Sequence, residues 1–385
     1  MQTSRFLANA HVLPLSFCAI YFGFLAAMLA PWSQKQFVFL HNIPFPFFPK
    51  FLTPQRYGLA PFKVRNFRLT TSDGVSLGAW HILPDEFYQE QMAKKSDDDS
   101  DQDAFSEDIF DQALQKYPTI IYLHGNAANR AAPFRVSTYS LLTNRLPVNV
   151  VAIDYRGFGD SQGDPCERGL VLDARAAWDW VIQRRGTKDE PTADDQERGV
   201  VIMGQSLGTG VAAKLGQELT LEGTPPQAVV LFAAYSGMRR LLTSFRPFGL
   251  LPLFAPFQLP ILSGLADRLL VTKFETSKHL PEMLFTKLGT PGGRRPHLVL
   301  LHAEDDRVIP SQNSKDLFHQ LWTLSRSDRP SNFTIPTFAT VETFQLGPHR
   351  NLESPNITLI NTLNGGHDRI GEGQVDLIAR FSGLK

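Results

Sequence analysis

Short apolar runs alternate with helical patterns over most of the chain after residue 118. Between the runs, apolar residues recur at helical spacing, as in residues 168–183 and 207–219. Runs of five or six apolar residues, bounded by glycine and separated by helices, are typical of a parallel sheet covered on both faces. We therefore predict an α/β fold with a mostly parallel, doubly wound sheet. The predicted strands are TIIYLHG, NVVAIDY, GVVIMG, QAVVLFA and HLVLLHA.

A hairpin is predicted ahead of this sheet. FKVRNFRL and VSLGAWHIL flank the segment TTSDG, in which Asp73 and Gly74 form the turn. We place the start of the main domain, residues 61–385, about here. The acidic run KKSDDDSDQDAFSED then interrupts the pattern, and such a run cannot bury apolar surface. We expect an acidic, mobile surface insertion over residues 85–116.

The N-terminal region contains a long uncharged stretch. Residues 12–30 contain no charged side chain and are numerous enough to cross a bilayer as a helix. A cleaved signal peptide is an alternative, although Met28 and Pro31 would make a cut after Ala30 a poor one. A buried helix is a third possibility. We predict a transmembrane anchor over residues 1–35.

Two further stretches are apolar but broken by proline. Residues 36–60 contain FVFLHNIPFPFFPKFL and form a membrane-proximal connector, either packed on the domain or seated in the lipid headgroup layer. Residues 237–285 are rich in Leu, Phe and Pro and would cap the site. The cap could line an acyl-binding site, touch the bilayer or simply pack over the sheet. Its Arg239, Arg240 and Arg246 could meet a phosphate or carboxylate head group or stay solvated.

Charge and composition narrow the class of ligand. The 385-residue chain has a formal net charge of zero, which gives no electrostatic footprint for nucleic acid. A neutral or apolar substrate fits that balance. The sequence has no His/Cys cluster typical of a metal site and no phosphate-binding loop, so we expect neither a metal nor a cofactor.

The pentapeptide GQSLG, residues 204–208, matches the motif G-x-S-x-G. The motif alone is common, but here a predicted strand precedes it and a predicted helix follows. That arrangement is typical of a nucleophile elbow, with Ser206 at the sharp turn and at the start of the helix. The helix dipole favours developing negative charge at this point. We predict Ser206 as a nucleophile.

An oxyanion hole is expected beside the predicted nucleophile. His124, Gly125 and Asn126 end the first parallel strand, where this fold places the loop that supplies one donor. The backbone N–H groups of Asn126 and Leu207 would then converge on the substrate carbonyl oxygen as it becomes negatively charged.

The acid and the base of a triad should follow later strands. In HAEDDRVIP the favoured acid is Asp306, with Asp305 and Glu304 as alternatives, because only one carboxylate of a short loop can face the imidazole. Two histidines could be the base. His367 is favoured because two glycines precede it and an amphipathic helix follows, and His349 is the alternative.

Several of these segments resemble one known family. YLHGNAANR, DYRGFGDSQGDPCERGL, GQSLG, HAEDDRVIP and the late GGH are similar to the single-pass membrane α/β-hydrolases that include the lysophosphatidylserine and monoacylglycerol lipases. The resemblance spans about residues 60–383. It implies hydrolysis of single-chain lipid esters by a domain facing the endoplasmic reticulum lumen, with Ser206, Asp306 and His367 at matching positions. The chain departs from the family in its acidic insert and in the long gap between Asp306 and His367.

These observations predict a serine hydrolase that cleaves carboxylic esters through an acyl-enzyme on Ser206. The expected substrates are single-chain lipids such as monoacylglycerol or lysophospholipid, and the expected partner is the membrane. A peptidase or thioesterase with the same triad and a non-catalytic, membrane-tethered interaction protein are the alternatives. Two N-glycosylation sequons, at Asn332 and Asn356, lie in predicted loops and would report a lumenal location.

Overall fold

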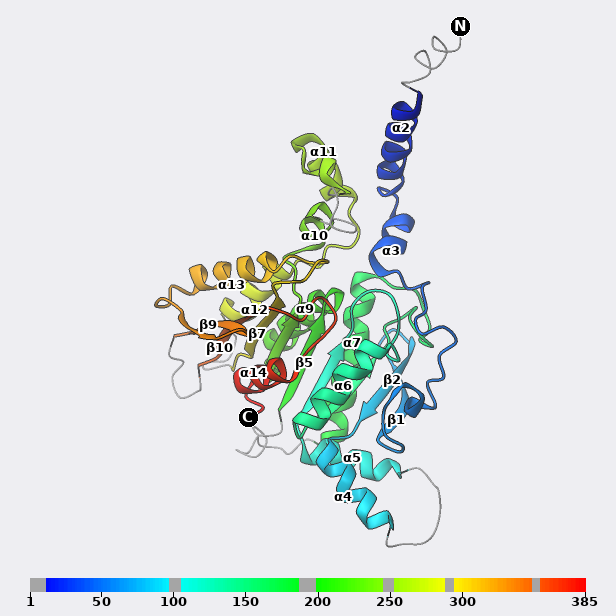
Figure 1. Ribbon diagram of the computed structural model, residues 1–385, viewed down its shortest axis with the longest axis vertical. Coiled ribbons are helices and arrows are strands. Elements are labelled where there is room, and N and C mark those ends of the chain that lie inside the picture. Colours follow the sequence, from blue (N-terminus) through cyan, green and yellow to red (C-terminus); the bar gives the residue numbers. More distant parts are fainter. Residues whose placement is uncertain (1–11, 97–104, 187–198, 245–252, 288–293, 348–353) are drawn as a thin grey trace.

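One mixed β-sheet runs through the centre of the molecule (Figure 1). The computed structural model describes residues 12–96, 105–186, 199–244, 253–287, 294–347 and 354–385. Within these residues ten strands follow the order β1-β2-β4-β3-β5-β6-β7-β10-β9-β8. The six strands from β4 to β10 in this order are parallel, and the two at each edge are antiparallel. The predicted mostly parallel α/β sheet is confirmed.

The strands of the centre match the apolar runs of the sequence because each is buried on both faces. In β3, for example, Ile121 packs into the core on one face while Ile120 packs into the core on the other. The strands are β1 (Val64–Thr70), β2 (Ser76–Ile82), β3 (Thr119–Leu123), β4 (Asn149–Ile153), β5 (Val200–Gln205), β6 (Ala228–Phe232), β7 (His297–Ala303), β8 (Ser331–Ile335), β9 (Ala339–Gln345) and β10 (Asn356–Thr362).

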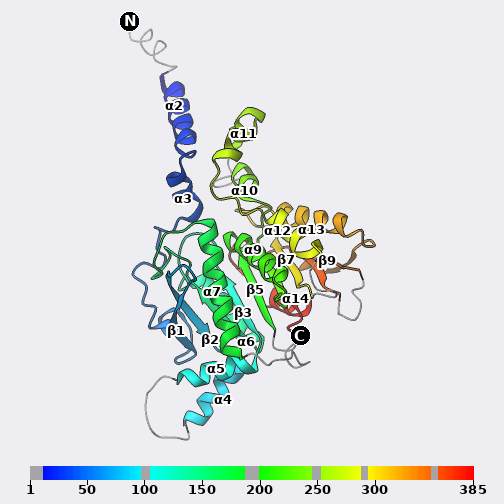
Figure 2. The same cartoon turned by 180° about the vertical axis from the view of Figure 1, so that it is seen from behind.

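Helices cover both faces of the sheet, as Figure 2 shows from behind. One face packs against α7 (Glu167–Arg185), α9 (Leu207–Leu221), α12 (Thr276–Phe285) and α13 (Gln312–Ser325). The other face packs against α6 (Pro133–Arg145) and α14 (Glu372–Ser382). Each core is therefore closed by amphipathic helices, which is the doubly wound arrangement.

The first hairpin has the predicted turn. β1 and β2 pair from Val64 opposite Ile82 to Thr70 opposite Ser76, and Gly74 adopts a φ of 83° in the turn between them. That left-handed conformation is one that glycine adopts without steric cost.

Two predicted surface segments contain more regular structure than expected. Most of residues 85–116 forms α4 (Asp85–Ser96) and α5 (Glu107–Lys116), which bury Phe87, Tyr88 and Phe110 in a small separate core. The acidic residues 97–104 between these helices lie outside the described residues. SNFTI, expected in a loop, forms the edge strand β8. Residues 187–198, a polar stretch between α7 and β5, also lie outside the described residues.

The N-terminal region forms two helices where one span was expected. α2 (Val12–Ala27) and α3 (Pro31–Phe39) meet at a bend of 93°. The break has a local cause, because Ala30 precedes Pro31 and takes an extended conformation that a helix cannot continue through. In the part of the chain that is described, no single helix has the length and apolarity to span a membrane, and α2 and α3 reach that length and apolarity only when the two are counted together.

The described part of the cap forms short helices that project beyond the sheet (Figures 1 and 2). α10 (Met238–Ser244), η3 (Ala255–Gln258) and α11 (Pro260–Leu269) lead from β6 towards α12. In both views α10 and α11 lie at the same end of the molecule as α2 and α3, and α4 and α5 lie at the opposite end. The two apolar regions of the sequence therefore lie close together in space.

Candidate active site

Ser206 stands at the turn between β5 and α9. Its φ of 50° and ψ of −117° are sparsely populated for a residue with a side chain, as a nucleophile elbow requires. Both glycines of the motif are needed for this turn. A Cβ at Gly204 would lie 2.3 Å from the carbonyl oxygen of Gly208, and one at Gly208 would lie 2.1 Å from that of Leu123. The structure thus has the predicted strand, turn and helix around Ser206.

Three side chains from separate loops form one hydrogen-bonded chain. Nε2 of His367 lies 3.0 Å from Oγ of Ser206, and Nδ1 lies 2.8 Å from Oδ2 of Asp306. Asp306 follows β7 and His367 follows β10, which pairs with β7 in parallel. The carboxyl ends of these strands meet at the edge of the sheet where the elbow lies. The three predicted residues therefore come together in the arrangement typical of acyl transfer.

The carboxylate of Asp306 is well supported by its surroundings. Oδ1 accepts the N–H groups of Val308 at 2.7 Å and Ile309 at 2.9 Å, while Nε2 of His302 lies 3.3 Å from Oδ2. Burial disfavours the charged carboxylate, but hydrogen bonds from His302 and His367 outweigh it and hold the pKa of Asp306 below its usual range. Asp306 is therefore ionised at neutral pH and can orient the imidazole.

The alternative acids have other partners. Oδ1 of Asp305 accepts the N–H of Gly366 at 2.8 Å and so steadies the loop that presents the imidazole. Glu304 pairs with Lys315 at 2.6 Å. The alternative base, His349, lies outside the described residues.

Gln205 links the elbow to the histidine loop. Its Nε2 donates to Oδ1 of Asp368 at 2.9 Å, and its Oε1 accepts the hydroxyl hydrogen of the buried Tyr122 at 2.7 Å. Gln205 precedes Ser206 and Asp368 follows His367, so this contact fixes the separation of the two loops that carry the Ser206–His367 hydrogen bond. Sequence reasoning missed this role because the position is variable in the motif.

The loop after β3 passes close to the nucleophile. A Cβ at Gly125 would lie only 3.3 Å from Cβ of Ser206. Asn126 and Leu207, the expected oxyanion donors, line the same pocket as Ser206. Within the described part of the chain, no acceptor is paired with the N–H of Asn126. Both residues thus border the pocket that contains the serine hydroxyl, and their assignment as oxyanion donors stays a prediction.

A fully buried arginine donates hydrogen bonds to the main chain of the loop after β3. The guanidinium of Arg135, on α6, donates to backbone carbonyl oxygens at distances of 2.9 to 3.2 Å. The acceptors belong to Gly125, Asn126, Ala127 and Asn129. Nothing in the sequence marks Arg135, because its partners are main-chain atoms.

The N-terminal connector also binds the loop through its main chain. Ala127 and Ala128 adopt left-handed conformations with φ of 53° and 55°, which are unusual for alanine. Three N–H groups of the loop donate to carbonyl oxygens of the connector. The pairs are Ala127 to Phe39 at 2.9 Å, Ala128 to Ile43 at 3.1 Å and Asn129 to Phe45 at 3.1 Å. The strained loop is therefore held between the connector and α6.

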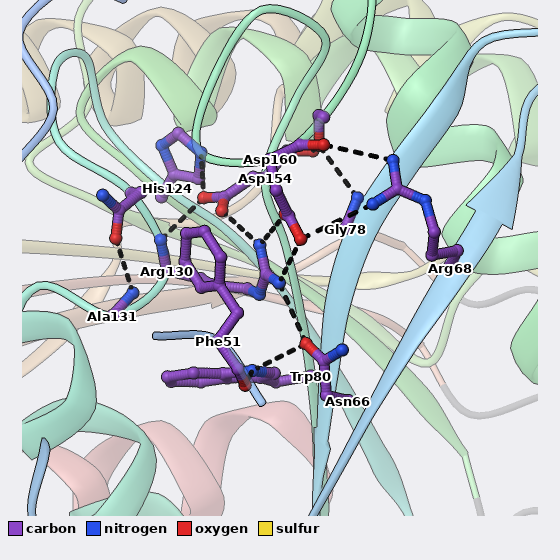
Figure 3. A network of polar contacts seen from close by, with 12 residues as sticks. Phe51, Asn66, Arg68, Gly78, Trp80, His124, Arg130, Ala131, Asp154 and Asp160 are labelled. Carbon is purple, nitrogen blue, oxygen red and sulfur yellow. Dashed lines mark hydrogen bonds and ion pairs between the residues drawn. The ribbon is translucent and has the colours of Figure 1, made fainter. Parts of the chain in front are cut away.

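A second buried arginine binds both aspartates of the segment DYRGFGDSQG. Arg130 is completely buried and donates to Asp154 at 2.5 Å and to Asp160 at 2.6 Å through Nη1, and to Asn66 at 3.0 Å through Nη2. Its guanidinium lies over the ring of Phe51, 3.7 Å from the centroid (Figure 3). The backbone N–H of Arg130 also donates to Asp154 at 2.6 Å. This network fixes the far end of the loop after β3 to β1, to the end of β4 and to the connector.

An apolar pocket of about 180 Å³ opens beside Ser206. Its walls come from three parts of the chain that are distant in sequence. Phe37 and Val38 lie on α3, Leu241 and Leu242 on α10, and Ile309 follows β7. The N-terminal segment, expected only as an anchor and connector, therefore forms part of the site.

The other residues singled out in the sequence have clear positions. Arg239 pairs with Asp267 at 2.6 Å, and Arg240 pairs with Asp316, whereas Arg246 lies outside the described residues. Asn332 is exposed on β8, and Asn356 begins β10. The expectation that both sequons lie in loops is therefore wrong, because these segments complete the sheet.

Known proteins resemble the chain in sequence. A model of the Alpha/beta hydrolase family matches residues 120–338. The chain is 34% identical to lysophosphatidylserine lipase ABHD12 of Danio rerio over 295 residues, which covers 75% of this chain and 66% of that protein. It is also 34% identical to lysophosphatidylserine lipase ABHD12 of Gallus gallus, covering 81% of this chain and 72% of that protein. The chain thus spans just under two thirds of the zebrafish protein.

The fold also matches a solved structure. The crystal structure of an alpha-beta hydrolase from Vibrio vulnificus superposes with a TM-score of 0.53 at 15% identity, and the match covers 94% of this chain and 90% of that one. At this identity the likeness concerns the fold alone. Together with the family match and the relatives, it shows that the chain belongs to the α/β-hydrolase family.

Proposed function

We propose that this chain is a serine hydrolase that cleaves the ester bond of single-chain lipids, such as lysophospholipids or monoacylglycerols. Ser206 is the nucleophile, His367 the general base and Asp306 the residue that orients the base. The observation that carries the proposal is the unbroken hydrogen-bonded chain from Asp306 through His367 to Ser206.

The geometry supports a two-step reaction. Oγ of Ser206 attacks the ester carbonyl while Nε2 of His367 takes the hydroxyl proton, and the N–H groups of Asn126 and Leu207 stabilise the oxygen as it becomes negative. The imidazolium then gives its proton to the leaving alcohol, and an acyl-enzyme remains on Ser206. A water molecule, activated by the same imidazole, releases the fatty acid and restores the serine.

The pocket supports an apolar acyl group as the part of the substrate next to the serine. Apart from Asn126 and Ser206, all side chains that line the pocket are apolar, including those of Met238 and Val308. Such a lining favours a hydrocarbon chain over a polar peptide. The name of the two relatives, lysophosphatidylserine lipase, supports a lysophospholipid as substrate.

Association with a membrane is part of the same proposal. α2 exposes large apolar side chains, among them Phe17 and Ile20. Water-exposed apolar surface of this extent favours contact with lipid. We infer that the N-terminal segment anchors the chain and that the hydrolase domain faces the lumen of the endoplasmic reticulum.

The proposal is tested with a substrate panel matched in acyl group. Oleoyl lysophospholipid, oleoyl glycerol, an oleoyl thioester and an oleoyl amide are offered to the full-length protein in detergent micelles, with Ser206→Ala as the blank. We expect the oxygen esters to be hydrolysed and the amide to be left intact. Preferential cleavage of the amide or thioester would assign a peptidase or thioesterase instead. No turnover of any compound would favour a non-catalytic role.

A further inference from the structure

A second apolar cavity adjoins the pocket beside Ser206. This distal cavity is narrow, with a volume of about 50 Å³, and two regions of the chain enclose it. The junction between α2 and α3 contributes Met28 and Leu29, and α3 contributes Phe37, while the cap contributes Phe254, Ala266 and others. Its size and lining fit the end of a hydrocarbon chain better than a head group.

The distal cavity and the pocket beside Ser206 share one wall. Phe37, Val38 and Leu242 line both spaces, so these side chains are what separates the distal cavity from the pocket beside Ser206. The ring of Phe37 lies edge-on to that of Phe254, with the centroids 5.2 Å apart. The region between the two cavities is therefore bordered by apolar side chains of the N-terminal segment and of the cap.

Polar contacts hold the two sides of the distal cavity together. The buried Gln34, on α3, donates through Nε2 to the carbonyl oxygen of Leu269 at 3.0 Å and accepts the N–H of Val271 through Oε1 at 3.0 Å. The hydroxyl of Tyr21, on α2, donates to the carbonyl oxygen of Leu253 at 2.9 Å. In Figures 1 and 2 these helices lie beside α10 and α11. The enclosure thus exists only because the N-terminal helices dock on the cap.

We propose that the distal cavity binds the far part of the substrate's acyl chain, which makes the N-terminal helices a substrate-binding element as well as an anchor. Long unbranched acyl chains then gain contacts that short chains cannot reach. Leu242 and Phe37 are specificity-determining positions at the entrance, and Ala266 is one at the far wall. This inference rests on the proposed ester hydrolysis at Ser206.

The test fills the distal cavity without touching the pocket beside Ser206. Ala266 lines only the distal cavity, so Ala266→Phe adds bulk there and leaves the reacting groups untouched. We expect kcat/KM for palmitoyl glycerol to fall by about tenfold or more while kcat/KM for butyryl glycerol stays at the parent value.

The matched control adds the same side chain on the same helix. Gly264 is exposed, and a Cβ there would meet no atom within 4 Å, so Gly264→Phe should leave both substrates unaffected. An unchanged palmitoyl-to-butyryl ratio in Ala266→Phe, or an equal loss on both substrates, would overturn the inference and leave the hydrolase assignment intact. A parent protein that hydrolyses neither ester would instead overturn the proposed function.

Discussion

A guanidinium nitrogen of Arg135 lies 3.1 Å from the carbonyl oxygen of Gly125. Nδ1 of His124 lies 2.6 Å from the same oxygen. Burial and the nearby Arg135 lower the pKa of His124 well below its ordinary value, so its ring is neutral and donates through Nδ1. Because a peptide unit is planar and trans, fixing the direction of the Gly125 carbonyl also fixes the opposite direction for the N–H of Asn126. The arginine therefore aims the proposed oxyanion donor without touching the substrate.

Replacing Arg135 with lysine should lower kcat more than it changes KM. A single ammonium cannot hold four carbonyl oxygens, so the N–H of Asn126 loses its fixed direction, and loss of one oxyanion donor lowers kcat by about 10²-fold or more elsewhere. Two quantities should fall together in this variant: kcat from steady-state kinetics and the affinity for a trifluoromethyl ketone. This inhibitor forms an adduct whose oxygen mimics the oxyanion.

A suitable control is Arg295→Lys. Arg295 also donates to main-chain carbonyl oxygens, those of Met283 and Thr286, but it precedes β7 and so lies at the opposite end of the strands from Ser206. We expect its kcat to stay close to the parent value. A raised KM with unchanged kcat in Arg135→Lys would contradict a positioning role.

His367→Ala and His349→Ala should differ sharply. Only the base takes the proton from Ser206, so His367→Ala should lower kcat by about 10⁴-fold, whereas His349→Ala should retain most of the activity. Thermal unfolding of both variants checks that the fold survives. An inactive His349→Ala beside an active His367→Ala would reverse the assignment of the base.

Acid should destabilise the fold partly through His81. Burial and the nearby Arg65 lower the pKa of His81 from an ordinary 6.5 to about 3. Below pH 6.5 the unfolded chain therefore binds a proton that the folded chain does not, so the free energy of unfolding falls as the pH falls. This group contributes about 2 kcal/mol of that loss between pH 7 and 5.

His81→Gln removes the titration at this site. Denaturant unfolding at pH 7 and pH 5 should show a smaller acid-induced loss in this variant than in the parent, whatever the stability of the variant at pH 7. Equal losses in the two proteins would show that His81 titrates alike in the folded and unfolded states.

Lumenal exposure should leave a glycan on Asn332. Its side chain is exposed on the edge strand β8, whereas Asn356 begins a strand between two neighbours and is partly buried. Endoglycosidase treatment of the protein from eukaryotic membranes should increase gel mobility, and Asn332→Gln should abolish most of that shift. The absence of a shift, together with digestion of the domain by protease added outside intact microsomes, would place it in the cytosol.

The centre of the fold can be predicted from the sequence because each of its elements has a pattern within a short stretch of residues. Each parallel strand is a continuous apolar run. Gly204 and Gly208 of the elbow are needed because a Cβ at either position would clash with a backbone carbonyl oxygen. The hairpin of β8 and β9 was missed because β8 is an exposed edge strand and lacks an apolar run. That hairpin, with α13 and β10, occupies much of the long stretch of chain between Asp306 and His367, whose residue numbers differ by 61.

The support around the site could not be predicted in the same way. Arg135 acts on main-chain oxygens, and the connector binds the oxyanion loop through N–H groups, so neither contact leaves a pattern of side chains. The helices that flank the acidic insert were missed for a related reason. Their buried Phe87 and Phe110 are few and lie far apart, and they form a core only when the two helices meet.

The most direct test of the central claim is the site of covalent labelling by a fluorophosphonate probe. The full-length protein is labelled in detergent micelles, digested and examined by mass spectrometry, in parallel with Ser206→Ala. The proposed mechanism predicts that the probe is found on the peptide containing Ser206 and that Ser206→Ala, folded to the same thermal stability, is neither labelled nor active on oleoyl glycerol. Labelling at another residue, or hydrolysis by Ser206→Ala at more than a few per cent of the parent rate, would contradict it.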